Sequence, residues 1–486
     1  MRILLMSDLS GRGHRGVHDA GPARADRSVV AVDVDSFDKV FARLAPALRL
    51  PLRDAGAPET VVEFHRLEDF HPDELYQRLD LFQTYRGMRR RVLDPVTFGE
   101  AAAELRRERA GQPEAIAHTG AGASRPPGQA FREDDRAMLE RLLGKSAAAG
   151  GPQRVDISRF LRRIVEPYIA PEKDPQQDEL VMLVDEATSA QMRQVMHHPA
   201  FQALEAAWRS VHRLVTSLEI GEDLKLYLLD LSRQELEADV LAAGRDLEQS
   251  ALFRVLVKEG SRAAGDQPWS LLVGDYSFGA DAKDASLLAA LGAIASQTGG
   301  PFLAAADHYV LGCRSLAESP DPRDWKPGDF GAARAWEALR RGSVASWIGL
   351  ALPRVLLRLP YGRRTDAAEQ FGFEEMPQSP DHEAYLWGNP AFACALLLAR
   401  SFLERGWAMQ PGDLLEIGDL PAHTYEEGGE RRMTPCAEVF LTERAADAIL
   451  SQGVMPLLSR RDSNAARLLR FQSVADPPAA LSGPWA

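Results

Sequence analysis

Three aspartates, Asp230, Asp275 and Asp307, are the residues whose type and spacing could support metal chemistry. Each follows an apolar segment that alternates with helical patterns, so the sequence predicts parallel strands ending at these acids. Open α/β sheets bind ligands at that edge, and clustered carboxylates there could hold Mg²⁺ for phosphoryl transfer. Aspartates also cap helices and turns at such positions. A magnesium-dependent phosphoryl-transfer or nucleotide-binding enzyme is therefore kept as the alternative function.

Three glycine-containing segments match known catalytic or phosphate-binding motifs only in part. Gly11–Gly16 has the G-x-G-x-x-G spacing after an apolar strand, but Pro22 and its neighbours predict a loop where a dinucleotide site needs a helix. Gly144-Lys145-Ser146 lacks the earlier glycine of a P-loop. Gly274–Gly279 has Asp275 where a nucleophile elbow needs glycine. These motifs predict no catalytic and no cofactor-binding residue.

Two adjacent histidines, His197 and His198, precede the strongest helical pattern of the chain. Neighbouring residues on a helix point about 100° apart, so the pair could not bind one metal ion together. Pro199 is typical of a first helical turn, which favours a helix-entry role and predicts no metal site. The apolar stripe that follows predicts a core helix; it consists of Phe201, Leu204, Trp208, Val211, Val215 and Leu218.

The composition predicts a globular protein of the cytoplasm. The chain has 486 residues, 45% of them hydrophobic, with a formal net charge of -13 and three widely spaced cysteines. Residues 1–110 hold 18 basic and 18 acidic side chains, so the acidic excess lies in residues 111–486. Acids interrupt the arginine cluster at 89–91 and 106–109, which favours a solvated or interface-pairing helix over nucleic acid. We expect no signal peptide and no membrane insertion.

Residues 1–110 predict a small α/β unit with its own core. The pattern indicates a strand at Ile3–Met6, a helix from Phe37 to Leu48 with Asp35 as its N-cap, a strand at Thr60–Phe64, and a helix that Pro72 begins and that runs to Tyr85. Residues 111–153, rich in Gly, Ala, Pro and Ser, predict a flexible linker.

Residues 154–486 predict a second, larger α/β domain. A βαβαβ pattern implies parallel strands with right-handed crossovers. Its strands are expected at 224–229, 270–273 and 301–305, with helices at 233–256 and 285–296 between them. The apolar runs 348–359 and 439–441 are expected to extend or flank the sheet, and a helix at 391–403 to pack nearby. The predicted fold class is α/β, with mixed sheets and packed helices.

The segment from His197 to Arg209 resembles the large subunit of the type VI secretion contractile sheath, the TssC (VipB) family. That family reads His-His-Pro-x-Phe-Gln-x-Leu-Glu-x-x-Trp-Arg at this place. Further resemblances follow in the same order along the chain and together span about residues 180–460; they are Asp223–Leu226, Ser232–Leu236, Pro268–Phe278, Pro301–Phe302, Trp336–Arg340, Gly349–Gly362, Phe373–Glu375 and Tyr385–Asn389.

The first 110 residues resemble the small sheath subunit, TssB (VipA), through Leu5–Gly11, Asp35–Asp38 and Phe64–Pro72. The two resemblances imply a two-part, sheath-like architecture in which subunits that normally form a heterodimer are fused. A flexible linker at 111–153 would raise their effective concentration.

The resemblance implies a mechanical role that needs no catalytic residue, cofactor or metal. Protomers of the family stack into a helical tube around an inner tube, on a baseplate, and repack to a shorter and wider state that drives the inner tube outward. Strands exchanged between protomers join the tube, a form of β-augmentation. The implied partners are other copies or other sheath subunits, the inner-tube protein and the baseplate.

The resemblance also implies an ATPase partner and a question about the chain ends. The family's disassembly ATPase, ClpV, recognises an N-terminal helix of the large subunit, and the matching amphipathic segment here is Asp156–Val165. TssB proteins have a segment before the strand at Ile3–Met6, and TssC proteins continue beyond the place where Trp485 stands. Either an atypical sheath component or an accessory that does not polymerise by itself is therefore expected.

Overall fold

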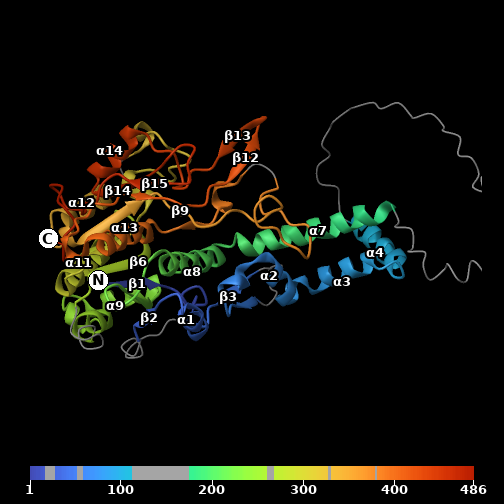
Figure 1. Ribbon diagram of the computed structural model, residues 1–486, viewed down its shortest axis with the longest axis horizontal. Coiled ribbons are helices and arrows are strands. Elements are labelled where there is room, and N and C mark those ends of the chain that lie inside the picture. The colour runs from blue at the N-terminus through green and yellow to red at the C-terminus, as the bar shows by residue number, and fades with distance from the viewer. Residues whose placement is uncertain are drawn as a thin grey trace, which may run out of the picture. The chain divides into compact units, whose positions relative to one another are not determined.

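The structure is a computed structural model of the chain (Figure 1). It describes residues 1–16, 28–51, 59–111, 175–259, 268–326, 330–377 and 380–485. Two compact units are present, one formed by Met1–Gln83 with Asp185–Ala486 and the other by Thr84–Val184. No helix among the described residues is long and apolar enough to cross a bilayer.

The first unit is organised around a nine-stranded mixed sheet, in agreement with the predicted fold class. Its order is β11-β15-β14-β8-β7-β6-β1-β5-β2. Neighbours from β5 to β14 are parallel, whereas β2, β15 and β11 pair antiparallel. The strands are β1 (Arg2–Ser7), β2 (Val30–Val32), β5 (Lys225–Asp230), β6 (Leu271–Phe278), β7 (Phe302–Ala306), β8 (Ile348–Leu352), β11 (Glu416–Ile417), β14 (Val454–Ser459) and β15 (Ala466–Leu468).

The first strand of the chain lies inside this sheet, between β5 and β6. Residues Ile3 to Met6 pair in parallel with both neighbours, and all six residues of β1 are buried. An uninterrupted apolar run such as Ile3–Met6 needs cover on both faces of the sheet and partners on both edges. The prediction that residues 1–110 have a core of their own is therefore wrong, because β1 lies between two strands of the predicted larger domain.

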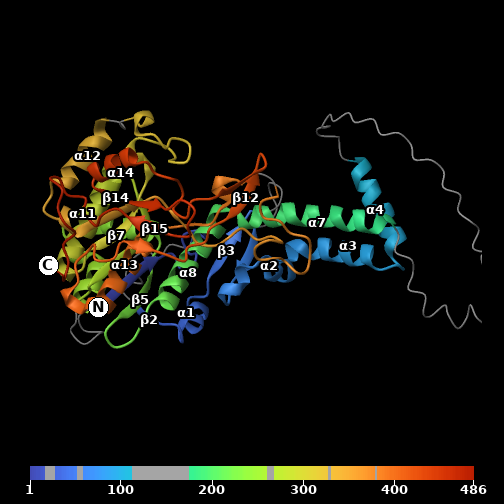
Figure 2. The ribbon, with the colours of Figure 1, turned by 45° about the horizontal axis from the view of Figure 1, so that its top comes forward.

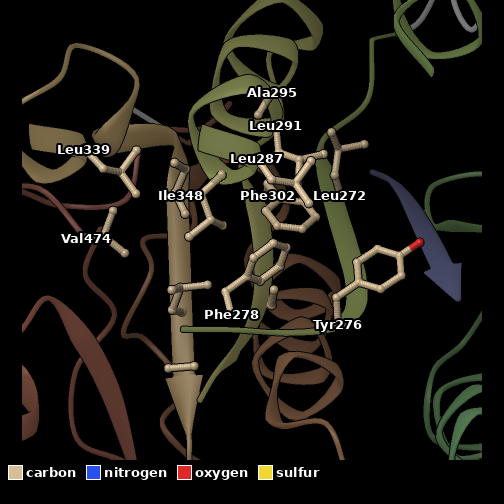
Figure 3. Close-up of a cluster of buried hydrophobic side chains, with 14 of the residues drawn as sticks. Leu272, Tyr276, Phe278, Leu287, Leu291, Ala295, Phe302, Leu339, Ile348 and Val474 are labelled. Carbon is tan, nitrogen blue, oxygen red and sulfur yellow. The ribbon is translucent and has the colours of Figure 1, made fainter. Parts of the chain in front are cut away.

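Alternate residues of the central strands face two helical layers. Phe302, Ala304 and Ala306 of β7 share a core cluster with Leu287 and Leu291 of α11 (Ala282–Thr298) (Figure 3). The residues between them face the other side, because strand side chains alternate. There α13 (Pro390–Arg405) packs against β6, β7 and β8, so the two helices lie on opposite sides of β7 (Figure 2).

The N-terminal elements end earlier than the sequence predicts. The first helix, α1 (Phe37–Leu44), begins after Ser36 and not Asp35, and it ends because Ala45 takes a left-handed φ of 47° before Pro46. Leu48 consequently lies in β3 (Ala47–Leu50), which pairs with β4 (Thr60–Glu63). Pro72 does begin α2 (Pro72–Arg78), but extended backbone at Leu79 separates it from the next helix; η2 (Leu67–Phe70) and η3 (Asp80–Phe82) flank it.

The second unit consists of helical segments. They belong to α3 (Gln83–Leu93), α4 (Phe98–Gly111) and α7 (Pro175–Met196). Gln177 donates hydrogen bonds to the carbonyl oxygens of Val92 and Leu93. Arg91 of the predicted arginine cluster pairs with Glu104 at 2.7 Å.

The remaining elements of the first unit connect and cover its sheet. The apolar run 439–441 forms no strand, because a tight turn links Val439 N–H to the Ala437 carbonyl. The helices are α8 (Pro199–Ser217), α9 (Arg233–Ala243), η4 (Leu247–Gln249), α10 (Ala251–Phe253), the π-helix η5 (Arg254–Glu259), η6 (His308–Leu311), η7 (Pro322–Asp324), α12 (Phe330–Arg340), η8 (Ala345–Trp347), η9 (His382–Ala384), η10 (Gly406–Ala408) and α14 (Glu443–Ser451). The short strands are β9 (Val355–Leu356), β10 (Trp387–Gly388), β12 (Thr424–Glu427) and β13 (Glu430–Met433).

Candidate functional site

The helix α8 forms the core that joins the two parts of the chain resembling different sheath subunits. Its Trp208 is fully buried, with ring centroids 4.3 Å from Phe41 and 5.7 Å from Phe37 of α1. The indole N–H donates a 2.8 Å hydrogen bond to the carbonyl oxygen of Leu9. Large aromatic side chains contribute strongly to core energetics, so this contact ties α8 to the N-terminal residues.

A second group of aromatic side chains packs in the same way near the N-terminal end of α8. Phe201 lies 5.8 Å from Phe64 and 5.4 Å from Phe70 between ring centroids, and the latter two rings stack at 4.2 Å. All three side chains are essentially inaccessible to solvent. The predicted apolar stripe of α8 is thus confirmed as a core face, because all its residues are buried. The aromatic partners of Phe201 and Trp208 come from residues 1–83.

The histidines that precede α8 act as the sequence predicts. His198 is the N-cap, with Nδ1 accepting a 3.2 Å hydrogen bond from the backbone N–H of Ala200, and Pro199 occupies the first helical position. His197 instead reaches toward Glu375, with 3.5 Å between Nε2 and Oε1. The two imidazoles therefore have different partners.

The most buried charged group of the unit is an ion network centred on Arg358. Its guanidinium bonds Glu205 of α8 at 2.8 Å and Glu375 at 2.7 Å. Arg209 bonds the same Glu205 at 2.7 Å and the Tyr361 hydroxyl at 2.9 Å. Glu205 and Glu375 have exposed fractions of 0% and 1%, so water does not compensate their charges.

Each charge in this buried network has a partner of opposite charge, which offsets the free-energy cost of removing it from water. Burial by itself would raise the pKa of Glu375, but the Arg358 guanidinium, the nearby His197 imidazole, and hydrogen bonds from Arg358 and the Tyr361 backbone lower it to about 2. Burial likewise opposes the charge of Arg358, yet Glu205 and Glu375 raise its pKa well above the ordinary value. The network holds α8, the segment around Arg358 and the segment around Glu375 in one arrangement.

A second charged cluster surrounds Glu438, whose side chain is also inaccessible. Arg354 bonds it at 2.6 Å and His382 lies 3.2 Å from it. Burial opposes the charge of Glu438, but the His308 imidazole 3.7 Å away and hydrogen bonds from His382 and Arg354 lower its pKa well below the usual range. Four chain segments thereby meet at one carboxylate.

The three aspartates of the alternative enzyme function do not form a common metal site. Asp230 ends β5 and pairs with Arg12 at 2.8 Å, whereas Asp275 lies inside β6 and not beyond it. Asp307 is the N-cap of η6. Asp275 and Asp307 line a cavity of about 440 Å³, but Asp230 is not part of its lining. Among the described residues, no group of three or more His, Cys, Asp or Glu side chains is placed to hold a metal.

The glycine motifs have conformational roles in the residues that the structure describes. Gly11 has a φ of 69°, and both oxygens of Asp8 accept backbone N–H groups from Arg12 and Gly13, so residues 11–16 form turns. Ser277 lies within β6, not at a strand-to-helix elbow. Gly144–Ser146, the segment Asp156–Val165 and all of the predicted linker 111–153 except Gly111, which ends α4, lie outside the described residues.

Comparison with known proteins identifies the family to which these features belong. Residues 178–475 match the VipB family, described as EvpB/VC_A0108, tail sheath N-terminal domain. The chain belongs to this tail sheath family. Residues 1–98 match the family described as type VI secretion system, VipA, VC_A0107 or Hcp2. A TssB-like part is therefore fused to a TssC-like part, as the sequence resemblance predicted.

A curated relative agrees with the family. The type VI secretion system sheath protein TssC1 of Pseudomonas aeruginosa strain PAO1 is 35% identical over 309 residues, which are 62% of this chain. The chain spans 61% of the length of that relative. The VipB family and this relative are both described as sheath proteins.

No sequence pattern predicts the ion network, although all of its residues lie in segments that resemble the large sheath subunit. Glu205 and Arg209 lie in the motif of α8, Arg358 and Tyr361 in the segment 349–362, and Glu375 in 373–375. Glu205, which directly follows the stripe residue Leu204, is the one local indication of a buried ion pair, because a charged side chain beside an apolar stripe is buried only when it is paired.

Proposed function

We propose that this chain is a structural component of a type VI secretion contractile sheath, fused from a small and a large subunit. Copies, alone or with other sheath subunits, stack helically around an inner tube above a baseplate in the cytoplasm. Repacking between two arrangements then drives the inner tube outward. Work in this proposal comes from changed contacts and not from bond chemistry.

The position of β1 is the observation that supports this function most strongly. The strand belongs to the VipA match, yet its partners β5 and β6 belong to the VipB match. A flexible tether between independent domains would not need such pairing. The fused parts instead fold as one building block, which is the unit that a helical lattice requires.

The hairpin of β12 and β13 offers a place where neighbouring copies could exchange strands. It is paired with no other strand that the structure describes, and most of its residues are exposed. The Thr434 N–H donates to the His423 carbonyl, which fixes the register of the hairpin. The backbone N–H and C=O groups of residues 423, 425 and 427 therefore face β13, whereas those of Glu426 face outward. An incoming strand could extend this edge.

Electron microscopy of the purified chain tests the proposal. Tubules or short helical stacks are expected when the chain is mixed with the inner-tube protein and the other sheath subunits of its system. Glu426→Pro should shorten or abolish them by removing an outward N–H, whereas the matched Glu426→Thr should not. Inert monomers under all these conditions would contradict the proposed function.

The disassembly ATPase remains a separate part of the proposal. The amphipathic pattern of Asp156–Val165 supports it as the ClpV-binding segment. A pulldown with the ATPase should lose signal when Phe160→Asp and Ile164→Asp are combined. Unchanged capture would remove this partner assignment and leave the sheath proposal intact.

A further inference from the structure

The outer edge of β4 has backbone groups that no described strand pairs. β4 pairs only with β3, and the Phe64 N–H bonds the Pro46 carbonyl. In an antiparallel ladder, the backbone N–H and C=O groups of alternate residues point toward the partner strand. Those of Thr60 and Val62 therefore point toward β3, and those of Val61 and Glu63 point away from it. Two independent bonds agree with this register, because the Glu63 carbonyl accepts from Arg78 and the Ala47 N–H donates to Ser10. The Val61 N–H and C=O and the Glu63 N–H have no hydrogen-bond partner within the described residues.

A groove runs along this free edge. It has a volume of about 320 Å³ and is formed by β4 on one side and by η2 and α2 on the other. Leu75 and Leu79 supply its apolar lining and are buried, while the Val61 side chain is 53% exposed. A strand edge beside a helix is the arrangement in which extended peptides add a strand and place alternate side chains in pockets.

The charged side chains of the groove indicate which charge a bound peptide would carry. Its lining carries Glu63, Asp69 and Glu74 against one cation, Arg78. Arg78 is already committed, because it pairs with Asp69 at 2.6 Å and with the Glu63 carbonyl at 3.0 Å. The Glu63 side chain is exposed. Arg66, just outside the lining, pairs with Asp69 at 3.4 Å and with Glu74 at 3.0 Å. An incoming strand therefore meets one exposed carboxylate, Glu63, that has no ion pair among the described contacts.

We infer that the β4–α2 groove binds an extended segment of a partner protein in which basic side chains alternate with apolar ones. Its backbone pairs with Val61 and Glu63, its apolar side chains lie over Val61 and Leu75, and a cation approaches the exposed Glu63. A second copy of this chain, with a net charge of -13, is the poorer source of such a segment. The inference goes beyond the proposed function, because it requires neither a tube nor contraction.

Fluorescence anisotropy with the full chain tests this inference. The probe is a short labelled peptide of alternating arginine and valine, compared at physiological ionic strength with the same peptide carrying glutamate in place of arginine. Only the basic peptide should bind. Val61→Pro, which removes one outward N–H and leaves the pairing with β3 in place, should weaken binding about fivefold to tenfold relative to the matched Val61→Thr.

Two further measurements separate strand addition from general attraction of a basic peptide to an acidic protein. A probe methylated on alternate backbone nitrogens keeps its charges but cannot donate to the Val61 carbonyl, and it should lose most of its affinity for the unmodified chain. Glu63→Gln should weaken binding by about threefold, as expected for one exposed charge. Equal affinity of the methylated probe, or equal affinity of the two Val61 variants, would overturn the inference.

Discussion

Glu375 and Asp275 are carboxylates of the same unit whose surroundings move their pKa values in opposite directions; Glu375 is buried, whereas Asp275 is half-buried at the edge of a cavity. Burial opposes ionisation at both sites. At Glu375 the Arg358 guanidinium and several donors reverse that effect and lower the pKa to about 2. At Asp275 burial prevails, with the nearby Asp8 adding to it, and the pKa rises to about 6 despite the hydrogen bond from Ser7.

The opposite pKa shifts of Glu375 and Asp275 show that the segments resembling the large subunit supply cations to one carboxylate and not to the other. Glu375, Glu205 and Arg358 belong to three separate segments that resemble the large subunit, and they compensate one another's charges. Asp275 also lies in such a segment, but its carboxylate has no cation within bonding distance among the interactions that the structure describes. Buried charge in this molecule therefore stabilises one arrangement of segments at the first site and costs free energy at the second.

The largest expected effect comes from removing the shared cation of the network. Arg358→Met leaves Glu205 and Glu375 buried without their central partner, so the free energy of unfolding should fall by about 3–5 kcal/mol. Arg364→Met is the matched control, because that side chain is 87% exposed and lies 4.0 Å from Glu426; it should change stability by less than about 0.5 kcal/mol. Urea unfolding at neutral pH measures both, and similar losses would contradict a special role of Arg358.

Acid titration of stability should isolate the Glu375 contribution. Its folded pKa is about 2, below the ordinary 4.5, so its stabilisation is complete above pH 4.5 and is lost as the pH falls toward 2. The loss should reach about 3 kcal/mol in that window. Glu375→Gln is less stable at neutral pH, and its difference from the unmodified chain should shrink as the pH falls. A constant difference between the two unfolding free energies would refute the lowered pKa.

The sequence was sufficient for elements whose periodicity or flanking residues are local. Pro199 and Pro72 marked the starts of α8 and α2, and the all-apolar run at β1 was read as a strand. The position of β1 between β5 and β6 could not be read, because more than two hundred residues separate it from both partners and strand order is a tertiary property.

The candidate site shows the same limit. The aromatic stripe of α8 was predicted from its spacing, but its partners Phe41 and Phe64 were assigned to a separate core. The ion network joins residues 205, 358 and 375, and no local pattern indicates such a pairing. Conversely, the predicted strand 270–273 ends before Asp275, whereas β6 continues to Phe278 and Phe302 packs against Gly274.

Asp275→Asn should stabilise the protein above pH 6. A folded pKa of about 6 against an ordinary 3.8 means that ionised Asp275 is penalised as the pH rises through this window, by up to about 3 kcal/mol. Asparagine keeps an oxygen acceptor for Ser7 and removes the charge, although its amide needs partners, so a gain of about 1–2 kcal/mol is expected. The gain should vanish below pH 3.8, and thermal or urea unfolding on both sides of the window measures it. A variant that is less stable at pH 7 would contradict this interpretation.

The smallest effect concerns the hydrogen bond that partly compensates Asp275. The Ser7 hydroxyl donates to its Oδ2 at 2.8 Å, so Ser7→Ala should raise the pKa of Asp275 further and cost about 1 kcal/mol above pH 6. The cost should be smaller in the Asp275→Asn background, because a neutral acceptor gains less from the same donor. A double-mutant cycle at two pH values measures this coupling. If the cost of Ser7→Ala is the same in both backgrounds, the hydroxyl does not stabilise the charge of Asp275. The Asp275 carboxylate would then have even less compensation, compared with Glu375 in the Arg358 network, than the two pKa values indicate.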